Sequence, residues 1–343
     1  MWIERSGTRA FRCLEDGPVG WGPGLCVIVG PNGSGKSSLI ESLAILLGWG
    51  PSGRGRDVPR WGDAEGRALL AASVRGETSF ELEACASARV TLRLDGRRAT
   101  CTDVRVAVPS LTFAPTDVAA LDGPPSARRA ILDRTCALLW PPYARRLAEL
   151  RQISRQRGAL LRQGRSPKGT DVPSAKLGGW IMEARRSAAR NVAALMADGP
   201  LPVRGVSLRV VPELDQGGEA WLLRELERSA REEARAMRPL VGPSRDDLEV
   251  LYHGHVASTS LSRGQKRRLL LSLILASARL VGMRFRRTPI LLFDDIAAEL
   301  DARAREEVGR ALADTGWQVF VTGTEHPFPS LGTSPVVVLS SRG

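Results

Sequence analysis

The sequence lacks the features that mark secreted, membrane-bound and metal-dependent proteins. Its five cysteines are odd in number and show no CxxC spacing, so they predict reduced thiols rather than disulfides or a zinc site. The three histidines are too few and too scattered for a metal centre. No run approaches the ~18 apolar residues of a membrane span, and the first residues lack the apolar segment of a signal peptide. We therefore expect a cytoplasmic protein that contacts no membrane.

Aromatic residues are also scarce, at 5% of the chain, and do not interleave with the basic clusters, so base stacking is not expected. Acidic residues are outnumbered by basic ones, 37 against 49, which leaves a formal net charge of +12. Only four of the basic residues are lysine. The arginine bias could reflect genomic base composition, but the planar guanidinium also suits phosphate oxygens. An excess this large predicts a polyanionic partner such as nucleic acid.

A phosphate-binding motif is present near the start of the chain. Residues 30–37 read GPNGSGKS and match G-x-x-x-x-G-K-[ST], between an apolar run at 25–29 and an apolar-periodic segment. This context predicts a strand, a phosphate-binding loop and a helix N-terminus. Lys36 would reach the β- and γ-phosphates of ATP, and the Ser37 hydroxyl would coordinate Mg²⁺. The predicted nucleotide-binding residues are Gly30, Pro31, Asn32, Gly33, Ser34, Gly35, Lys36, Ser37 and Ser38.

Two acids follow another apolar run far downstream. Residues 290–293 read ILLF and predict a buried strand that ends at Asp294 and Asp295. Asp294 would hold the Mg²⁺ opposite Ser37, and Asp295 would orient or deprotonate the attacking water. Alternatively, both acids merely cap the next helix. The P-loop in the same chain favours the first interpretation, with Lys36 and Asp295 as catalytic residues.

The order of strand and helix signals predicts an α/β fold with two lobes. Residues 1–115 and 262–343 would form a P-loop ATPase lobe in which both ends of the chain share one sheet. Residues 116–261 would form an inserted, mostly helical second lobe.

Some local elements can also be predicted. Asp95 and Gly96, which follow alternating apolar residues, predict a type I′ hairpin. Residues 104–108 and 111–113 are typical of strands. Residues 164–179, rich in Gly, Ser, Pro and Lys, are typical of a mobile loop.

A third motif, LSRGQ at residues 261–265, stands at a predicted helix start. Ser262 can cap the helix and Gly264 lets a backbone N–H approach an anion, although a plain helix cap would also explain the motif. A P-loop, this turn, two acids and then Glu299-Leu300-Asp301 follow the order of the ABC-type ATPases. In that class the turn caps the γ-phosphate held by a second subunit, which predicts an ATP-dependent head-to-tail homodimer that hydrolysis releases. The residues assigned to this contact are Ser262, Arg263, Gly264, Gln265 and Asp301.

Four further stretches lie outside these motifs: residues 113–117 (FAPTD), 130–134 (AILDR), 241–248 (VGPSRDDL) and 318–322 (QVFVT). With them, the chain resembles the RecF family of bacterial recombination proteins nearly from end to end. The most specific stretch is 241–248, which looks like the family's glycine–proline–histidine–arginine–aspartate–aspartate–leucine block. The resemblance implies an ATP-dependent DNA-binding protein of recombinational repair that hydrolyses ATP. With RecO and RecR, it would help load recombinase at single-strand gaps.

The resemblance also implies roles for residues outside the motifs. Arg12 would lie near the nucleotide. Thr322 or Thr324 would occupy the place of the γ-phosphate-sensing histidine of transporters.

The chain departs from the family at four points. Ser244 stands where the family usually has histidine, and Arg263 replaces the glutamine common in the signature turn. Gly323 interrupts the threonine run after the last strand. No glutamine lies where an ABC Q-loop would couple Mg²⁺ to the second lobe, and Asp117 is the candidate substitute. Because Asp295 is shorter than the glutamate of transporters, we expect slow hydrolysis.

Residues 128–165 are the most basic part of the chain, with ten arginines and only two acids. At about 100° per residue, Arg151, Arg155 and Arg162 fall on one arc of a helix. They predict a surface that follows DNA phosphates, although a solvated face in an arginine-rich protein would look the same.

A second candidate DNA contact is Arg54, Arg56 and Arg60, in the glycine-rich loop after the first helix. This loop could equally be a plain surface turn. Either cluster would contact the backbone of duplex, gapped or single-stranded DNA rather than read its sequence.

Three other classes of protein share some of these features. The ATPase subunit of a membrane transporter should have a Q-loop glutamine and a histidine directly after the last strand, but His326 lies four residues beyond Thr322. A small-molecule kinase would leave the 261–265 turn and the basic lobe unexplained. An SMC-like scaffold would bind ATP without DNA-stimulated turnover.

Overall fold

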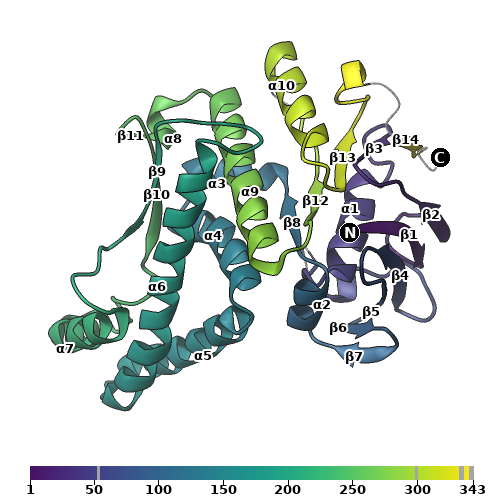
Figure 1. Cartoon of the computed structure of the whole chain (residues 1–343). Helices are drawn as coiled ribbons and strands as arrows, with labels where there is room; N and C mark the ends of the chain where they lie inside the picture. Colours follow the sequence, from purple (N-terminus) through teal and green to yellow (C-terminus); the bar gives the residue numbers. More distant parts are fainter. Residues whose placement is uncertain (52–54, 298–299, 332–335, 340–343) are drawn as a thin grey trace. The chain divides into compact units, whose positions relative to one another are not determined.

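The structure, a computed structural model, describes residues 1–51, 55–297, 300–331 and 336–339. The chain divides into two compact units, whose elements are labelled in Figure 1. The first comprises Met1–Val118, Asp198–Val203 and Ser262–Gly343, and the second Ala119–Ala197 and Arg204–Leu261. The first unit thus takes in both ends of the chain. It also contains residues 198–203, which the sequence assigns to the helical lobe.

A five-stranded parallel sheet belongs to the first unit, with strand order β14-β3-β13-β12-β8. Its strands are β3 (Leu25–Val29), β8 (Ser110–Phe113), β12 (Ile290–Phe293), β13 (Val319–Gly323) and β14 (Val336–Val338). β12 and β13 are buried along their whole length, as parallel strands covered on both faces are. The prediction that both ends of the chain share one sheet is therefore confirmed.

The first unit also contains a six-stranded antiparallel sheet with the order β2-β1-β4-β5-β6-β7. Its strands are β1 (Trp2–Arg9), β2 (Gly17–Gly20), β4 (Ala68–Arg75), β5 (Phe80–Ala86), β6 (Val90–Leu94) and β7 (Arg97–Ala99). Asp95 and Gly96 join β6 to β7 with φ angles of 50° and 72°, which confirms the predicted hairpin. Alternate residues of β4 and β5 are buried and pack with α1 (Lys36–Leu46) into one hydrophobic core.

Three further helices of this unit are α2 (Cys101–Ala107), α9 (Arg263–Phe285) and α10 (Ala302–Ala313). The prediction of a strand at 104–108 is wrong, because most of that segment lies in α2. A capping box starts the helix: Asp103 N donates to Thr100 Oγ1 (3.2 Å), and Thr100 N donates to Asp103 Oδ2 (2.8 Å). Such a cap is worth about 1 kcal/mol, which outweighs the strand-like alternation of valines. The strand predicted at 111–113 is confirmed as β8.

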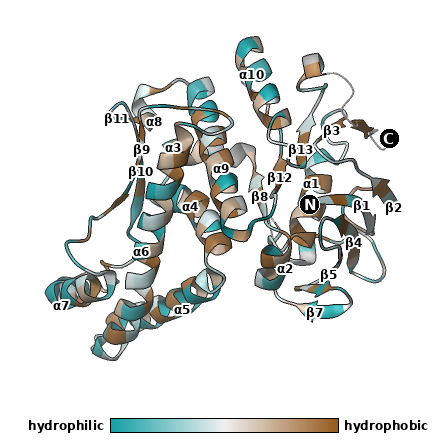
Figure 2. Cartoon of the chain, viewed as in Figure 1, coloured by the Kyte–Doolittle hydropathy of each residue, from teal (hydrophilic) through white to brown (hydrophobic). Residues whose placement is uncertain are grey.

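The second unit is mostly helical. It contains the end of α3 (Pro115–Asp122), followed by α4 (Pro125–Leu139), α5 (Tyr143–Arg162), α6 (Asp171–Met196), α7 (Gly218–Ala236) and the short α8 (Ala257–Ser260). Its antiparallel sheet has the order β11-β10-β9 and consists of β9 (Val206–Val211), β10 (Asp247–Tyr252) and β11 (His255–Val256). The mixed colouring of α5 in Figure 2 reflects apolar residues and arginines on one helix.

The start of α6 corrects the prediction of a mobile loop over 164–179. A short 3₁₀ helix, Lys168–Thr170, leads directly into α6. The glycines that suggested a loop serve helix packing instead. A Cβ on Gly179 would lie 2.2 Å from the backbone N of Glu219, and one on Gly178 would lie 2.5 Å from Leu222 Cδ2. Any larger residue at these positions would force α6 and α7 apart.

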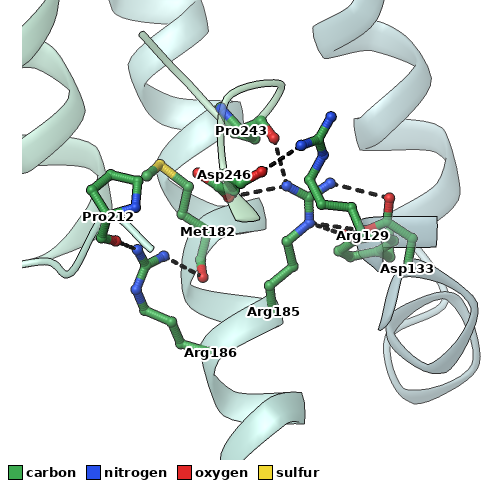
Figure 3. Close-up of polar contacts among 9 residues, drawn as sticks. Arg129, Asp133, Met182, Arg185, Arg186, Pro212, Pro243 and Asp246 are labelled. Atoms are coloured by element: carbon green, nitrogen blue, oxygen red, sulfur yellow. Dashed lines mark hydrogen bonds and ion pairs between the residues drawn. The ribbon is translucent and has the colours of Figure 1, made fainter. Parts of the chain in front are cut away.

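A buried charge network crosses the second unit around Arg185 of α6 (Figure 3). The Arg185 side chain is 3% exposed and donates to Asp133 Oδ1 (2.8 Å), Asp246 Oδ2 (3.0 Å) and the Pro243 carbonyl (2.7 Å). Tyr143 donates its hydroxyl to Asp133 (2.5 Å). Burial raises the pKa of Asp246, and the charge of Arg185 opposes that rise. Because Pro243 and Asp246 belong to the 241–248 block, this block ties the loop before β10 to α4 and α6.

Candidate nucleotide-binding site

The glycine-rich loop joins β3 to α1 within the first unit. Gly33 and Gly35 have φ angles of 83° and 97°, a region that favours glycine. Gly30 is required by a close approach, since a Cβ there would lie 2.4 Å from the Leu339 carbonyl oxygen. Gly35 is the N-cap of α1 and has no side chain to satisfy the first N–H groups of the helix. These donors therefore remain available to an anion at the helix N-terminus.

A cavity of about 870 Å³ opens at this loop. Its lining combines loop residues with the ends of β12 and β13, and includes Lys36, Ser37, Asp294, Asp295, Thr322 and Thr324. Lys36 Nζ donates to the carbonyl oxygens of Gly30 (2.7 Å) and Pro31 (2.8 Å), which holds the ammonium over the loop. Residues predicted to act on one nucleotide from distant parts of the sequence thus line a single cavity.

The turn after β12 presents the two acids. Thr322 of β13 is fully buried; its hydroxyl donates to Asp294 Oδ1 (2.7 Å) and accepts from Asp295 N (2.8 Å). Asp295 is exposed and has a φ angle of 49°, unusual for a residue other than glycine. The main chain of this turn is therefore held in a left-handed conformation while the Asp295 carboxylate faces the cavity.

The residues of the cavity suit ATP with Mg²⁺. The Ser37 hydroxyl and the Asp294 carboxylate are oxygen ligands, which Mg²⁺ prefers, and Lys36 supplies a counter-charge for phosphates. Across the described residues, no group of three or more His, Cys, Asp and Glu side chains could hold a metal ion by itself. A Mg²⁺ ion here would accordingly complete its coordination with phosphate oxygens and water.

Arg12 lies beside the loop but turns toward α1. Its Nη2 atom is 2.7 Å from Glu41 Oε2, in an ion pair with a carboxylate that is 9% exposed. Its backbone N donates to the Val58 carbonyl (3.1 Å). The cavity lining includes the next residue, Cys13, rather than Arg12. A direct contact between Arg12 and the nucleotide remains a prediction.

The signature residues start α9. Ser262 is the N-cap: Gln265 N donates to Ser262 Oγ (3.4 Å), and Ser262 N donates to Gln265 Oε1 (2.9 Å). The plain cap considered from the sequence is therefore present. Ser262, Arg263 and Gln265 are nevertheless exposed, so the cap does not hide them from a second chain. Asp301 likewise caps α10, where its Oδ1 accepts from Ala304 N (2.7 Å).

The arginines of α5 divide into two groups. Arg151, Arg155 and Arg162 are exposed, whereas Leu150 and Leu161 of the same helix are buried. Arg157 is 3% exposed and donates to Glu233 (2.7 Å), which is itself fully buried. Part of the positive charge counted from the sequence therefore serves the packing of the second unit.

The loop after α1 contributes less to the DNA prediction. Arg54 lies outside the described residues, and only the backbone of Arg56 is described, in a short 3₁₀ helix at Gly55–Asp57. Arg60, further along, donates to the Leu14 carbonyl (2.5 Å) and to Asp16 (2.6 Å). The guanidinium of Arg60 thus ties the loop to the 10–16 segment.

Two contacts that shape the site could not be predicted from the sequence. One is the double hydrogen bond of Thr322. The other comes from Arg267 of α9, which is 3% exposed and donates to the carbonyls of Asp295 and Ile296. Arg267 stands in the basic run Lys266-Arg267-Arg268, just before the apolar stretch 269–275, and nothing in that pattern identifies its partner.

None of the described helices combines the length and the hydrophobicity that a membrane span requires.

Comparison with known proteins identifies the family of this chain. The model of the RecF/RecN/SMC N terminal domain matches residues 65–342. DNA replication and repair protein RecF of Heliobacterium modesticaldum is 31% identical over 352 residues, which cover 95% of this chain and 92% of that protein. RecF of Brucella suis is 33% identical over 350 residues, covering 94% and 90%.

Solved structures show the same fold. The structure of the recombination mediator protein RecF-ATPrS in the RecFOR pathway aligns with a TM-score of 0.83 at 21% identity, covering 94% of this chain and 92% of that one. An SMC head bound to the C-winged helix domain of ScpA aligns with a TM-score of 0.52 at 18% identity, covering 95% and 90%. The fold is thus that of the ABC-type ATPases to which RecF and SMC heads belong, and the chain is a member of the RecF family.

Proposed function

We propose that this protein is an ATP-dependent DNA-binding protein of recombinational repair and that ATP closes it into a head-to-tail dimer. The observation that carries the proposal is the cavity in which Lys36, Ser37, Asp294 and Asp295 come together. The names of its RecF relatives, DNA replication and repair proteins, support the biological role.

Four residues of the cavity have a task in ATP hydrolysis. The α1 N-terminus and Lys36 bind the phosphates, and the lysine stabilises the negative charge that develops in the transition state. Ser37 and Asp294 would hold Mg²⁺, which would supply positive charge to neutralise the phosphates. Asp295 orients the attacking water and accepts its proton. Because an aspartate reaches less far than a glutamate, turnover is slow and hydrolysis acts as a timer.

The site of one chain is incomplete without a second copy. Its cavity supplies a P-loop and two acids, while the exposed Ser262 turn faces solvent on the same unit. In the dimer, the N-terminus of α9 in one chain caps the γ-phosphate in the other, with Asp301 and Thr324 near the interface. Two helix N-termini then stabilise one terminal phosphate.

DNA is the polyanion that the charge excess favours. Arg151, Arg155 and Arg162 are exposed on α5 and would follow the phosphate backbone. RecO and RecR are the proposed partners, in line with the RecF structure of the RecFOR pathway. The preferred substrate would be duplex next to a single-strand gap, where recombinase is loaded.

The proposal is tested by measuring binding to a gapped duplex with ATP, ADP or no nucleotide. We expect tight binding with ATP only. Lys36→Ala should lose ~10–100-fold in ATP affinity, because charge-assisted hydrogen bonds are worth about 1.5–3 kcal/mol, and should lose ATP-dependent DNA binding with it. Arg284→Ala, at the far end of α9 from the signature turn, is the control for charge loss. Equal DNA binding under all nucleotide conditions would contradict the proposal.

A scaffold that binds ATP without DNA-stimulated turnover is the alternative. Such a scaffold would have the same nucleotide cavity and form the same dimer. The similarity of this chain to an SMC head is compatible with it. ATP hydrolysis that is identical with and without gapped duplex would favour it.

A further inference from the structure

We propose that Arg267 is a positioning residue for hydrolysis, which sets the place of the Asp295 carboxylate from within the signature helix. This inference rests on the proposed function, because it assigns Asp295 to the attacking water. It concerns a contact inside one chain and within the first unit alone.

The guanidinium of Arg267 contacts the turn after β12. Arg267 Nε donates to the Ile296 carbonyl (3.0 Å), and Arg267 Nη2 donates to the Asp295 carbonyl. The guanidinium lies 6.0 Å from the centre of the Phe113 ring, on the strand next to β12. With 3% of its surface exposed, the side chain is fixed by packing. One planar group thus grips two successive carbonyls of the turn after β12.

These hydrogen bonds hold the backbone of Asp295 in place. Asp295 adopts a φ angle of 49°, a conformation that costs a residue with a Cβ of the order of 1 kcal/mol. Thr322 holds the N–H of Asp295, and Arg267 holds its carbonyl. Both peptide groups of Asp295 are therefore fixed by buried side chains, and its carboxylate remains free to face the cavity. Without Arg267 the turn can relax toward an ordinary conformation that directs the carboxylate elsewhere.

The position of Arg267 in α9 links the turn after β12 to the signature turn. It lies five residues after Ser262, in the first turns of the helix whose N-terminus would cap the partner's γ-phosphate. Lys266 N donates to the Ser262 carbonyl (2.9 Å), so the turn and the following residues form one hydrogen-bonded segment. Any shift of the start of α9 on dimer closure would move the Arg267 guanidinium. The two carbonyls that it binds, and therefore Asp295, would move with it. The base of one site is thereby linked to the signature that serves the other.

The experiment compares Arg267→Gln and Arg267→Lys with wild type in ATP hydrolysis and in ATP affinity. Glutamine removes the charge and replaces the wide guanidinium by a smaller amide, and lysine keeps the charge on one nitrogen without the planar, rigid arrangement of donors. We expect kcat to fall ~10–100-fold in Arg267→Gln and less in Arg267→Lys, because a misplacement of about 1 Å can cost ~10²-fold. ATP affinity should stay within about twofold, since Arg267 does not line the cavity.

Arg268→Gln is the matched control. Arg268 is the next residue of α9 and donates to Glu307 (2.5 Å) instead of the turn after β12, so its kcat should stay near that of wild type. A kcat of Arg267→Gln within twofold of wild type would overturn the inference, and so would a parallel loss of kcat and ATP affinity. If Arg267→Gln does not fold, the same two criteria apply to Arg267→Lys. Failure of wild type to hydrolyse ATP would instead contradict the proposed function.

Discussion

At the scale of single residues, the hydroxyl of Thr322 joins the two acids of the site. It donates to the side chain of Asp294 and accepts from the backbone of Asp295, from a position with no exposed surface. The family resemblance implies that Thr322 or Thr324 takes the place of a γ-phosphate sensor. The geometry adds a second role, since the same hydroxyl orients the predicted Mg²⁺ ligand and the predicted base.

Thr322→Val tests that role. Valine has nearly the same shape but no hydroxyl, so Asp294 loses a donor and Asp295 N an acceptor, each worth about 1 kcal/mol. We expect hydrolysis to slow ~10-fold or more at nearly unchanged ATP affinity, with Thr322→Ser close to wild type. Steady-state rates and ATP titrations give both quantities. A valine variant that hydrolyses ATP normally but no longer prefers ATP to ADP would assign Thr322 to sensing alone.

At the scale of elements, the 241–248 block shows how a family-specific stretch can serve packing. Asp246 accepts from Arg185 of α6, and Asp247 accepts from Arg128 of α4 (2.6 Å). Both contacts are made by the aspartates of the block. Ser244, which replaces the usual histidine, is exposed and lies apart from the buried network.

Arg185→Met should destabilise the second unit strongly. The change removes the guanidinium of Arg185 from Asp246, which is fully buried, and from Asp133, which is partly exposed. Removing one partner of a buried ion pair costs about 3–5 kcal/mol. Burial already raises the pKa of Asp246, so its folded form takes up a proton more readily than the unfolded chain. Stability from this group is present at low pH and is lost as pH rises through the folded pKa. Denaturant unfolding should therefore show a smaller loss at about pH 5 than at about pH 8; an equal loss would contradict the account.

Elements marked by local chemistry could be predicted from the sequence, and elements set by distant contacts could not. The P-loop between β3 and α1, the acids after β12 and the hairpin at Asp95 all have signals within a few residues. The helix α2 was missed because its cap competes with an alternating pattern. The start of α6 was missed because Gly178 and Gly179 are explained only by α7, nearly forty residues downstream. The partners of Thr322 and Arg267 lie 27 to 29 residues away along the chain, so no local pattern could reveal them.

At the scale of the whole molecule, the net charge of +12 is not evenly available to a partner. Arg128, Arg157 and Arg185 form ion pairs inside the second unit, so their charge is neutralised there. The exposed arginines of α5 are better placed to meet DNA. The salt dependence of DNA binding should therefore depend on the exposed arginines of α5.

Arg151→Ala, Arg155→Ala and Arg162→Ala combined should weaken binding to gapped duplex and flatten its salt dependence. Each phosphate contact contributes about 0.9 to the slope of log K against log salt, so the slope should fall by up to about 2.7. The matched control removes three exposed arginines of α7, Arg228, Arg231 and Arg235. An unchanged slope in the α5 variant, or an equal change in the control, would show that α5 is only a solvated surface.

The central claim is that two copies of the chain enclose ATP, each supplying its signature turn to the other. Light scattering with Asp295→Asn tests it most directly, because slow hydrolysis should trap the closed state. With ATP and Mg²⁺ we predict a mass of twice the 37.1 kDa of one chain, and with ADP the mass of one. Adding Ser262→Arg to the same chain, which blocks the approach of a γ-phosphate, should return the ATP sample to the monomer mass. A single-chain mass for Asp295→Asn at saturating ATP, or a dimer that persists with ADP and with Ser262→Arg, would contradict the account.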